Sequence, residues 1–254
     1  MKKLFGNLCI ATFITASPLL IQAQNSYVSI KASSNKATGP YAKVEDTLRK
    51  QFEEKKLTWP PEQVYIRSFK FDRQVEVWVK GEEDAAFKLF KSYRMCMQSG
   101  TIGPKRMEGD YQMPEGFYYI NEFKPNSNFH LALGLNYPNA SDKVLSDSHR
   151  PGGDIYIHGG CVSTGCIAIS DRPIEELYIL TSHAKNQGQE FIPVHVFPVK
   201  YNVKKSFEYL AEVTKENQSL QKFAISLKAV FDKFEEKKEL PLILVNKKGE
   251  YIVE

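Results

Sequence analysis

The sequence predicts a mainly β protein of the α+β class, with flanking helices and a C-terminal helical extension. Between residues 64 and 201, short segments rich in β-branched and aromatic residues alternate with turn residues, which is typical of a mostly antiparallel sheet or sandwich. Apolar residues recur at helical spacing before this region, in 41–56, and after it, in 220–234. A chain of 254 residues is long enough to bury the core that this arrangement requires.

The first 23 residues have the composition of a secretory signal peptide. Two lysines, at positions 2 and 3, precede an apolar stretch over 4–21, and the small residue Ala23 stands at the expected cleavage site. A membrane anchor is the alternative, but polar residues and Pro18 interrupt the stretch and make it a poor span. We therefore expect cleavage near Ala23 or Gln24, export to the periplasm or cell envelope, and no transmembrane segment in the mature chain.

The elements of the mature chain are expected in a simple order. Residues 24–58 form a polar lead-in and the short helix within 41–56, which a Trp-Pro-Pro sequence at 59–61 ends. A domain at 59–200 begins with two strands joined by a hairpin at Asp72-Arg73. A helix at 173–187 has Ser170 or Asp171 as its N-cap and Pro173 at its first position. Further strands are expected in five segments, 86–97, 116–123, 129–137, 152–160 and 190–199.

The last 54 or so residues, 201–254, are expected to be a helical extension with a terminal hairpin. Seven apolar residues between Leu220 and Phe234 follow the 3,4 repeat of an amphipathic helix. The polar face of this helix mixes acids with lysines, which favours packing on the β domain over binding to an anionic membrane. The hairpin is expected around Lys248-Gly249.

The segment "IYIHGGCVSTGCIAISD" at 155–171 places an imidazole and two thiols on a glycine-rich turn. A thiol attacks a carbonyl carbon well only as a thiolate, and a neighbouring imidazole can take its proton and form an ion pair with it. His158 ends an apolar strand, and Cys166 lies just before the predicted helix, whose N-terminal dipole favours a thiolate and an oxyanion. The pattern predicts catalysis by a cysteine nucleophile.

Three cysteines, Cys96, Cys161 and Cys166, remain after the predicted signal peptide. An odd number in an exported protein leaves at least one free thiol. Three other interpretations remain open: a Cys161–Cys166 disulfide, a zinc site with His158, Cys161 and Cys166, or a buried structural pair. The zinc site lacks a fourth ligand at standard spacing. We expect no metal and no cofactor, and the absence of a basic cluster interleaved with aromatic residues argues against a nucleic-acid partner.

Two blocks of the sequence resemble one enzyme family, the YkuD-domain L,D-transpeptidases. "IHGG", followed by "STGCIAI", resembles its active-site signature of His-Gly, a spacer and Ser-x-Gly-Cys, and the short spacer resembles that of its YafK-like subgroup. Upstream, "GPKRMEGDYQMPEGFYYI" at 103–120 resembles a second segment of the same family. The resemblance covers residues 59–200 and implies the β-sandwich-like catalytic domain of L,D-transpeptidases, acting on the stem peptides of peptidoglycan.

The resemblance also implies roles for single residues. Cys166 would be the nucleophile, His158 the base, and the carbonyl of Gly159 would orient the imidazole. Ser163, Thr164 and Gly165 would shape the oxyanion or substrate pocket, although Thr164 stands where many members have histidine. Ala168 stands where many members have an arginine that can partner a carboxylate or oxyanion. The candidates to replace that arginine are His149, Arg150, Lys105 and Arg172.

These inferences predict an exported L,D-transpeptidase that forms a thioester at Cys166 with a stem peptide and transfers the acyl group to an amine. Hydrolysis of the same thioester, by an L,D-carboxypeptidase or endopeptidase, is the first alternative, and a non-catalytic wall-binding module is the second. Cys161 lacks the setting of Cys166, so its replacement is expected to leave most activity unless it shapes the oxyanion loop. The C-terminal helix is expected to border the active-site cleft.

Overall fold

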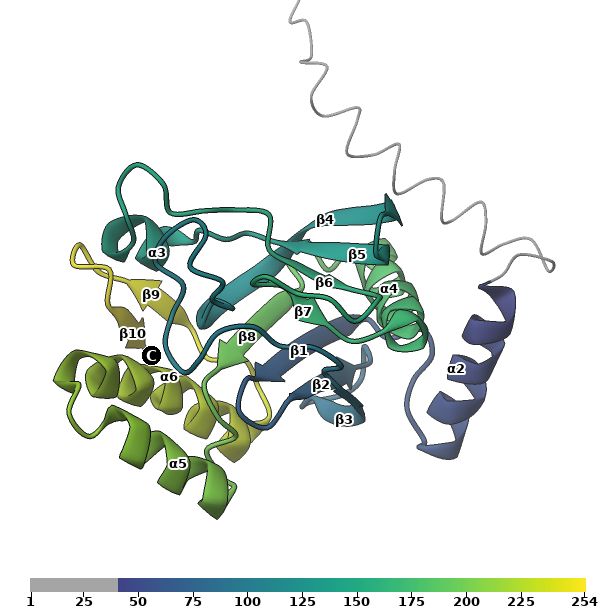
Figure 1. The fold of residues 1–254 in the computed structure, drawn as a ribbon. Coiled ribbons are helices and arrows are strands. Elements are labelled where there is room, and N and C mark those ends of the chain that lie inside the picture. The colour runs from purple at the N-terminus through teal and green to yellow at the C-terminus, as the bar shows by residue number, and fades with distance from the viewer. Residues whose placement is uncertain (1–40) are drawn as a thin grey trace, which may run out of the picture.

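The computed structural model describes residues 41–254, so the predicted signal peptide and the first part of the lead-in lie outside the described residues. Within 41–254, eight strands form one curled sheet in the order β3-β2-β1-β8-β4-β5-β6-β7 (Figure 1). Helices flank this sheet, so the predicted mainly β architecture with additional helices is confirmed. The strands are β1 Gln63–Phe69, β2 Gln74–Lys80, β3 Lys88–Arg94, β4 Gly116–Ser127, β5 His130–Leu135, β6 Tyr156–His158, β7 Ile167–Ala168 and β8 Pro193–Phe197.

The first hairpin forms where the sequence places it. β1 and β2 pair antiparallel, with Phe69 opposite Gln74, so the turn contains Asp72 and Arg73. Arg73 adopts a left-handed conformation, with φ of 51°. Both strands are buried along almost their whole length, because other parts of the chain cover both faces of the sheet.

The eight-stranded sheet is mostly antiparallel, as expected, but two of its strand pairs are parallel. β8 lies beside β1, with Ile66 opposite Val194, and β7 lies beside β6, with Ile157 opposite Ile167. A parallel neighbour requires a crossover connection, and α4 (Asp171–Asn186) provides part of the long connection that leads back to β8. In both parallel pairs, the two strands are therefore not joined by a hairpin turn.

Helix α4 packs against α2 (Ala42–Glu54) and the sheet through a buried apolar face. Its start differs from the prediction. Ser170 occupies the N-cap position with φ of 65°, but its hydroxyl makes no capping hydrogen bond and donates instead to the Ile169 carbonyl. Pro173 is the third helical residue rather than the first, because the helix already begins at Asp171.

The C-terminal extension contains α5 (Lys204–Thr214), α6 (Gln218–Lys237) and a hairpin of β9 (Ile243–Val245) and β10 (Tyr251–Val253). Helix α6 packs on the sheet: the Phe234 ring contacts Tyr65 and Trp78 at centroid distances of 4.8 and 5.1 Å. The buried Arg67 guanidinium lies 2.6 Å from Glu76 and 2.7 Å from Glu235 of α6. The extension therefore shares its core with the region before it.

Two smaller features complete the described chain. Helix α3 (Ala140–Leu145), which was not predicted, begins with a capping box in which the Asn139 side chain accepts from the Asp142 N–H and Asp142 accepts from Asn139. Over residues 41–254, none of the helices combines the length and apolar character needed to cross a membrane.

Candidate active site

The pairing of β6 with β7 brings the chain segments that carry His158 and Cys166 side by side. Ile157 and Ile167 are opposite partners and both point into the core. Side chains alternate along a strand, so His158 points to the other face. Cys166 directly precedes β7, and its thiol receives a hydrogen bond from the backbone of Tyr156 in β6. The two candidate catalytic residues thus lie on, or directly before, two neighbouring strands.

His158 is held in one orientation and one tautomer. Its side chain is buried, its ring lies 4.7 Å from the Phe129 ring, and its Nδ1 is 2.5 Å from the Gly159 carbonyl oxygen. A carbonyl only accepts, so Nδ1 carries the proton and Nε2 is left with a free lone pair. Burial lowers the pKa of His158 below its ordinary value of 6.5, although the Gly159 hydrogen bond opposes that shift. The ring is therefore a neutral base at neutral pH.

Gly159 has no room for a side chain. A Cβ at this position would lie 2.7 Å from the Phe129 carbonyl oxygen, 2.7 Å from a carboxylate oxygen of Asp171 and 3.1 Å from the Cβ of His130. Its N–H donates to the Leu131 carbonyl at 3.1 Å. The residue that orients the imidazole is thus fixed by close packing on several sides.

Cys166 is the free cysteine among the described residues, and its Sγ lies 3.6 Å from the Asp154 carbonyl oxygen. Burial raises the pKa of the Cys166 thiol above its ordinary value of 9.0, and a backbone hydrogen bond from Tyr156 offsets part of this shift. The shifts of Cys166 and His158 both favour neutral groups. These shifts favour a thiol and an imidazole over the ion pair that the sequence suggested.

The start of α4 contacts the turn after His158, at Gly160, whereas the sequence led us to expect an effect on Cys166. β7 separates Cys166 from the helix, and the Asp171 carboxylate at the helix start accepts a hydrogen bond of 2.7 Å from the Gly160 N–H. A helix dipole acts mainly within the first turn. The predicted direct effect of the helix on the Cys166 thiolate stays a prediction, whereas the start of α4 fixes the turn that follows His158.

Ser163 shapes the loop directly before the nucleophile. Its hydroxyl donates to the Cys166 carbonyl at 2.7 Å and accepts from the Gly165 N–H at 3.2 Å. Gly165 has φ of 143°, and a Cβ there would lie 3.2 Å from the Gln112 carbonyl oxygen. Because the Gly165 N–H is already bonded, Gly165 contributes conformation rather than an oxyanion donor.

The Cys166 thiol opens into a cavity of about 420 Å³. Lys105 lies in its wall, with Nζ 2.6 Å from Asp110 and 2.8 Å from the Met107 carbonyl oxygen. Asp110 also accepts from three backbone N–H groups of the 106–112 loop, so it holds this wall in shape. The cavity is lined by Lys105, Glu108, Gly109, Tyr111, Gly152, Gly153, Asp154, Ile155, Thr164, Gly165 and Cys166.

The four candidates to replace the usual arginine lie in different places. Lys105 is in the cavity wall, whereas Arg150 is exposed and pairs with Glu108 at 3.0 Å, at the rim. His149 is exposed and contacts the neighbouring Ser148 hydroxyl at 2.9 Å. Arg172 points along α4, with its Nε 3.3 Å from Glu176. Of the four candidates, Lys105 is therefore the one that lines the same cavity as Cys166.

The C-terminal extension does not contribute to this cavity. None of the lining residues comes from 201–254, so the expectation that the C-terminal helix borders the cavity is wrong.

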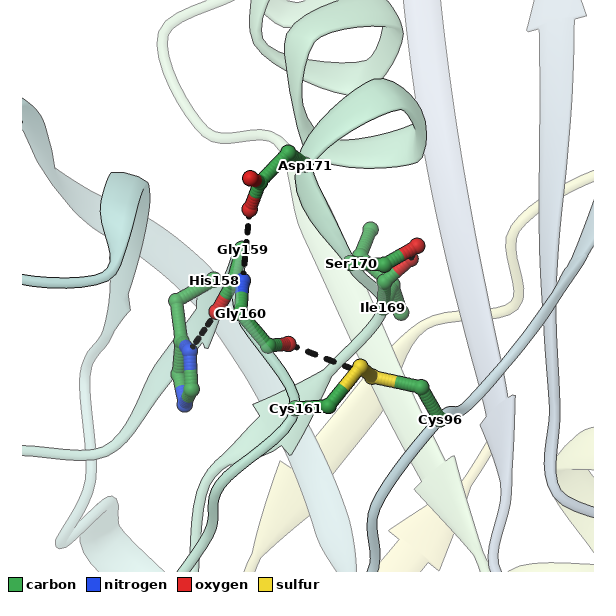
Figure 2. Close-up of a disulfide and its surroundings, with 8 residues drawn as sticks. All are labelled: Cys96, His158, Gly159, Gly160, Cys161, Ile169, Ser170 and Asp171. Atoms are coloured by element: carbon green, nitrogen blue, oxygen red, sulfur yellow. Dashed lines mark hydrogen bonds between the residues drawn. A yellow bond between two sulfur atoms is a disulfide. The ribbon is translucent and has the colours of Figure 1, made fainter.

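A disulfide joins Cys96 to Cys161 across 65 residues of sequence. Figure 2 shows it on one side of the Gly159–Gly160 turn, with the His158 ring on the other side. The bond takes up Cys161, so the alternatives of a Cys161–Cys166 disulfide and of a zinc site with Cys161 as ligand are both wrong. It also accounts for the odd number of thiols after the predicted signal peptide.

Sequence reasoning missed the acidic and aromatic part of the cavity wall. Glu108, Tyr111 and Asp154 line the cavity, but each lies in an irregular loop without periodic pattern. The signal that could have found them is position: the loop 103–112 lies inside the upstream block that resembles the family, and the loop 150–155 directly precedes the active-site block.

A family model described as the L,D-transpeptidase catalytic domain, YkuD, matches residues 65–196, just over half of the chain, and includes both His158 and Cys166. The chain belongs to the L,D-transpeptidase family, whose members modify peptidoglycan.

The chain is 33% identical over 195 residues to YafK of Escherichia coli K12, whose name assigns it provisionally to the L,D-transpeptidases. The match covers 75% of this chain and 73% of that protein. Among solved structures, the helical cell shape determining protein Pgp2 of Campylobacter jejuni matches with 20% identity and a TM-score of 0.43, over 72% of this chain and 73% of Pgp2. Bd1075 of Bdellovibrio bacteriovorus matches with 20% identity and a TM-score of 0.39, over 75% and 79% of the two chains.

Proposed function

We propose that this protein is an exported cysteine L,D-transpeptidase that acts on peptidoglycan stem peptides through a thioester at Cys166. One observation carries the proposal: a free thiol opens into a cavity directly before β7, and the paired strand β6 ends in a buried imidazole whose Nε2 is left unprotonated. Family membership supplies the substrate class. The predicted signal peptide supports export to the compartment where this substrate lies.

The neutral resting pair sets the order of the proton transfers. As the Cys166 sulfur attacks the carbonyl carbon of the L,D peptide bond, its proton moves to Nε2 of His158. The imidazolium then protonates the leaving amine, the terminal D-amino acid departs, and the acyl group remains on sulfur as a thioester. An amine acceptor attacks the thioester, and its proton returns through His158 to the sulfur.

Lys105 is the candidate that handles substrate charge in place of the arginine. Its Nζ is fixed by Asp110 and the Met107 carbonyl in the cavity wall, so its position is set before substrate binds. A stem peptide ends in a carboxylate, which an ammonium in this wall would attract.

The proposal is tested with purified tetrapeptide muropeptides, with and without an amine acceptor. We expect release of the terminal D-amino acid and, with acceptor, a product joined to that amine. Cys166→Ala should abolish both products, and His158→Ala should lower turnover by about 10²–10⁴-fold, the usual worth of a general base. Release without transfer would show that water resolves the thioester and that the enzyme is a hydrolase. Turnover retained in Cys166→Ala would refute the proposal.

A further inference from the structure

We propose that the Cys96–Cys161 disulfide is a positioning element of the active site, which keeps the His158 imidazole aligned with Cys166 and makes the oxidised protein the active form. This inference rests on the proposed function. It concerns residues that neither contact the cavity nor take part in the proton transfers.

Cys96 is the fixed end of the disulfide. Its backbone N–H donates to the Ala168 carbonyl at 3.0 Å, and the adjoining Met97 forms a bridge with Ala168. On the other side of Cys96, the Met95 N–H donates to the Arg73 carbonyl at 2.9 Å. The segment 95–97 is therefore docked against β7, the short strand that begins directly after Cys166.

Cys161 is the other end, and it lies in an exposed loop. Residues 160–165 connect His158-Gly159 to Cys166, and both Cys161 and Val162 are exposed. This loop meets the 96–99 segment at three points: the disulfide, a 3.1 Å contact between the Cys96 sulfur and the Gly160 carbonyl oxygen, and the Ser99 and Ser163 hydroxyls, which lie 3.4 Å apart. The disulfide is the one covalent link among the three.

The turn before Cys161 controls the imidazole through a single peptide group. The Gly159 carbonyl and the Gly160 N–H belong to one planar unit. Its oxygen accepts from His158 Nδ1, and its N–H donates to Asp171 at 2.7 Å, as Figure 2 shows. A rotation of this plane would remove the acceptor from Nδ1 and the donor from Asp171 together. The disulfide restrains this rotation because it fixes the chain on the C-terminal side of Gly160.

The same loop ends at the nucleophile, so the disulfide acts on both partners. Ser163, which lies two residues after Cys161, bonds the Cys166 carbonyl and the Gly165 N–H. Reduction would leave the loop attached by hydrogen bonds alone, with the half-buried Gly160 before Cys161 and the exposed Val162 after it. The expected loss is one of alignment, and a misplacement of about 1 Å can cost about 10²-fold in rate.

The redox step is an ordinary exchange. A dithiol reductant gives two electrons and two protons to the disulfide, which leaves free thiols on Cys96 and Cys161 and a disulfide on the reductant. The exposure of Cys161 gives a reductant access. Burial raises the pKa of the Cys166 thiol, which disfavours attack by its thiolate on the disulfide.

The test removes the disulfide and measures, in two independent ways, whether the His158 imidazole is still aligned with Cys166. The double variant Cys96→Ser/Cys161→Ser is made in a Cys9→Ser background, so that Cys166 is its only thiol. The first measurement is kcat and KM on tetrapeptide muropeptides. The second is the rate of alkylation of Cys166 by iodoacetamide between pH 5 and 9, which does not require the proposed reaction. Circular dichroism confirms the fold, and His158→Ala in the same background provides the reference for lost alignment.

We expect the double variant to keep KM within about threefold, to lose about 10–100-fold in kcat, and to alkylate with the pH profile of His158→Ala. Wild-type kcat with a wild-type alkylation profile would overturn the positioning role and leave the disulfide as a stabiliser.

If the double variant does not fold, wild-type protein is titrated with dithiothreitol below its melting temperature. Activity should then fall with the reduced fraction and return on reoxidation with oxidised dithiothreitol; activity independent of the reduced fraction would overturn the proposal. If His158→Ala alkylates as the wild type does, the base role of His158 fails first, and the positioning role fails with it.

Discussion

Replacing Gly159 with alanine tests whether close packing around one residue sets the rate. The added Cβ would stand 2.7 Å from both the Phe129 carbonyl oxygen and the Asp171 carboxylate, roughly half an ångström inside van der Waals contact. The Phe129 oxygen belongs to the backbone and yields little. Asp171 can rotate away, but only by giving up its bond to the Gly160 N–H, a charge-assisted hydrogen bond worth about 1.5–3 kcal/mol.

Either response shifts the peptide group that orients His158. If about 1.4–2.7 kcal/mol of this perturbation reaches the transition state, kcat falls by about 10–100-fold. The measurement is kcat and KM for release of the terminal D-amino acid, together with the melting temperature. We expect a loss in kcat that exceeds any change in KM.

Gly188→Ala is the matched control. Gly188 has φ of 102°, so alanine there is strained, but it lies at the end of α4 with open space around its Cβ position. This variant should lower the melting temperature and leave kcat unchanged. A Gly159→Ala enzyme with wild-type kcat, or a Gly188→Ala enzyme with the same loss in kcat, would refute the reasoning.

Three further predictions follow from burial. Burial lowers the pKa of His158 below 6.5 and raises the pKa of Cys166 above 9.0, so the pair acts as a neutral base and a neutral thiol. A pH profile of kcat/KM should therefore rise through a pKa below 6.5 and stay flat to about pH 9. An ascending limb above pH 7.5 would contradict the neutral pair. Phe234→Ala should lower the free energy of unfolding by about 3–5 kcal/mol in urea melts, since its fully buried ring contacts two aromatic rings of the sheet; a loss under 1 kcal/mol would show that the extension is only loosely packed. Burial raises the pKa of the Asp142 carboxyl group from an ordinary 3.8 to about 6, so ionisation of this group destabilises the folded protein. The free energy of unfolding should therefore fall by about 2–3 kcal/mol as pH rises from 4 through 6. Urea melts of Asp142→Asn at pH 4.5 and 7 should lack this dependence on pH.

Features that depend on neighbours in sequence could be predicted, and those that depend on distant contacts could not. The hairpin at Asp72-Arg73 and the apolar face of α6 follow from local patterns, and both are present. The parallel pairing of β1 with β8 joins segments more than 120 residues apart, and periodicity carries no information about such partners.

The same distinction holds at the site. His158 and Cys166 could be proposed together because they are eight positions apart in the sequence and the chemistry of each is explicit. The partner of Cys161 lies 65 residues earlier, and nothing local to Cys96 marks it. The protonation of the pair could not be judged from the sequence because burial, which shifts both pKa values, is a property of the folded chain.

The buried Arg67 has a consequence for how this protein can be recombined with its relatives. Its guanidinium is held by Glu76 from the neighbouring strand and by Glu235 from α6, while Phe231 and Phe234 lie 5.1 and 4.8 Å from it. A chimera spliced near residue 200 would inherit the cation from one parent and half of its counter-charge from the other. Removing one partner of a buried ion pair costs about 3–5 kcal/mol, so mismatched parents should not yield a stable hybrid. Exchange of substrate specificity between such enzymes is better sought in the loops at 103–112 and 150–155, which leave this network intact.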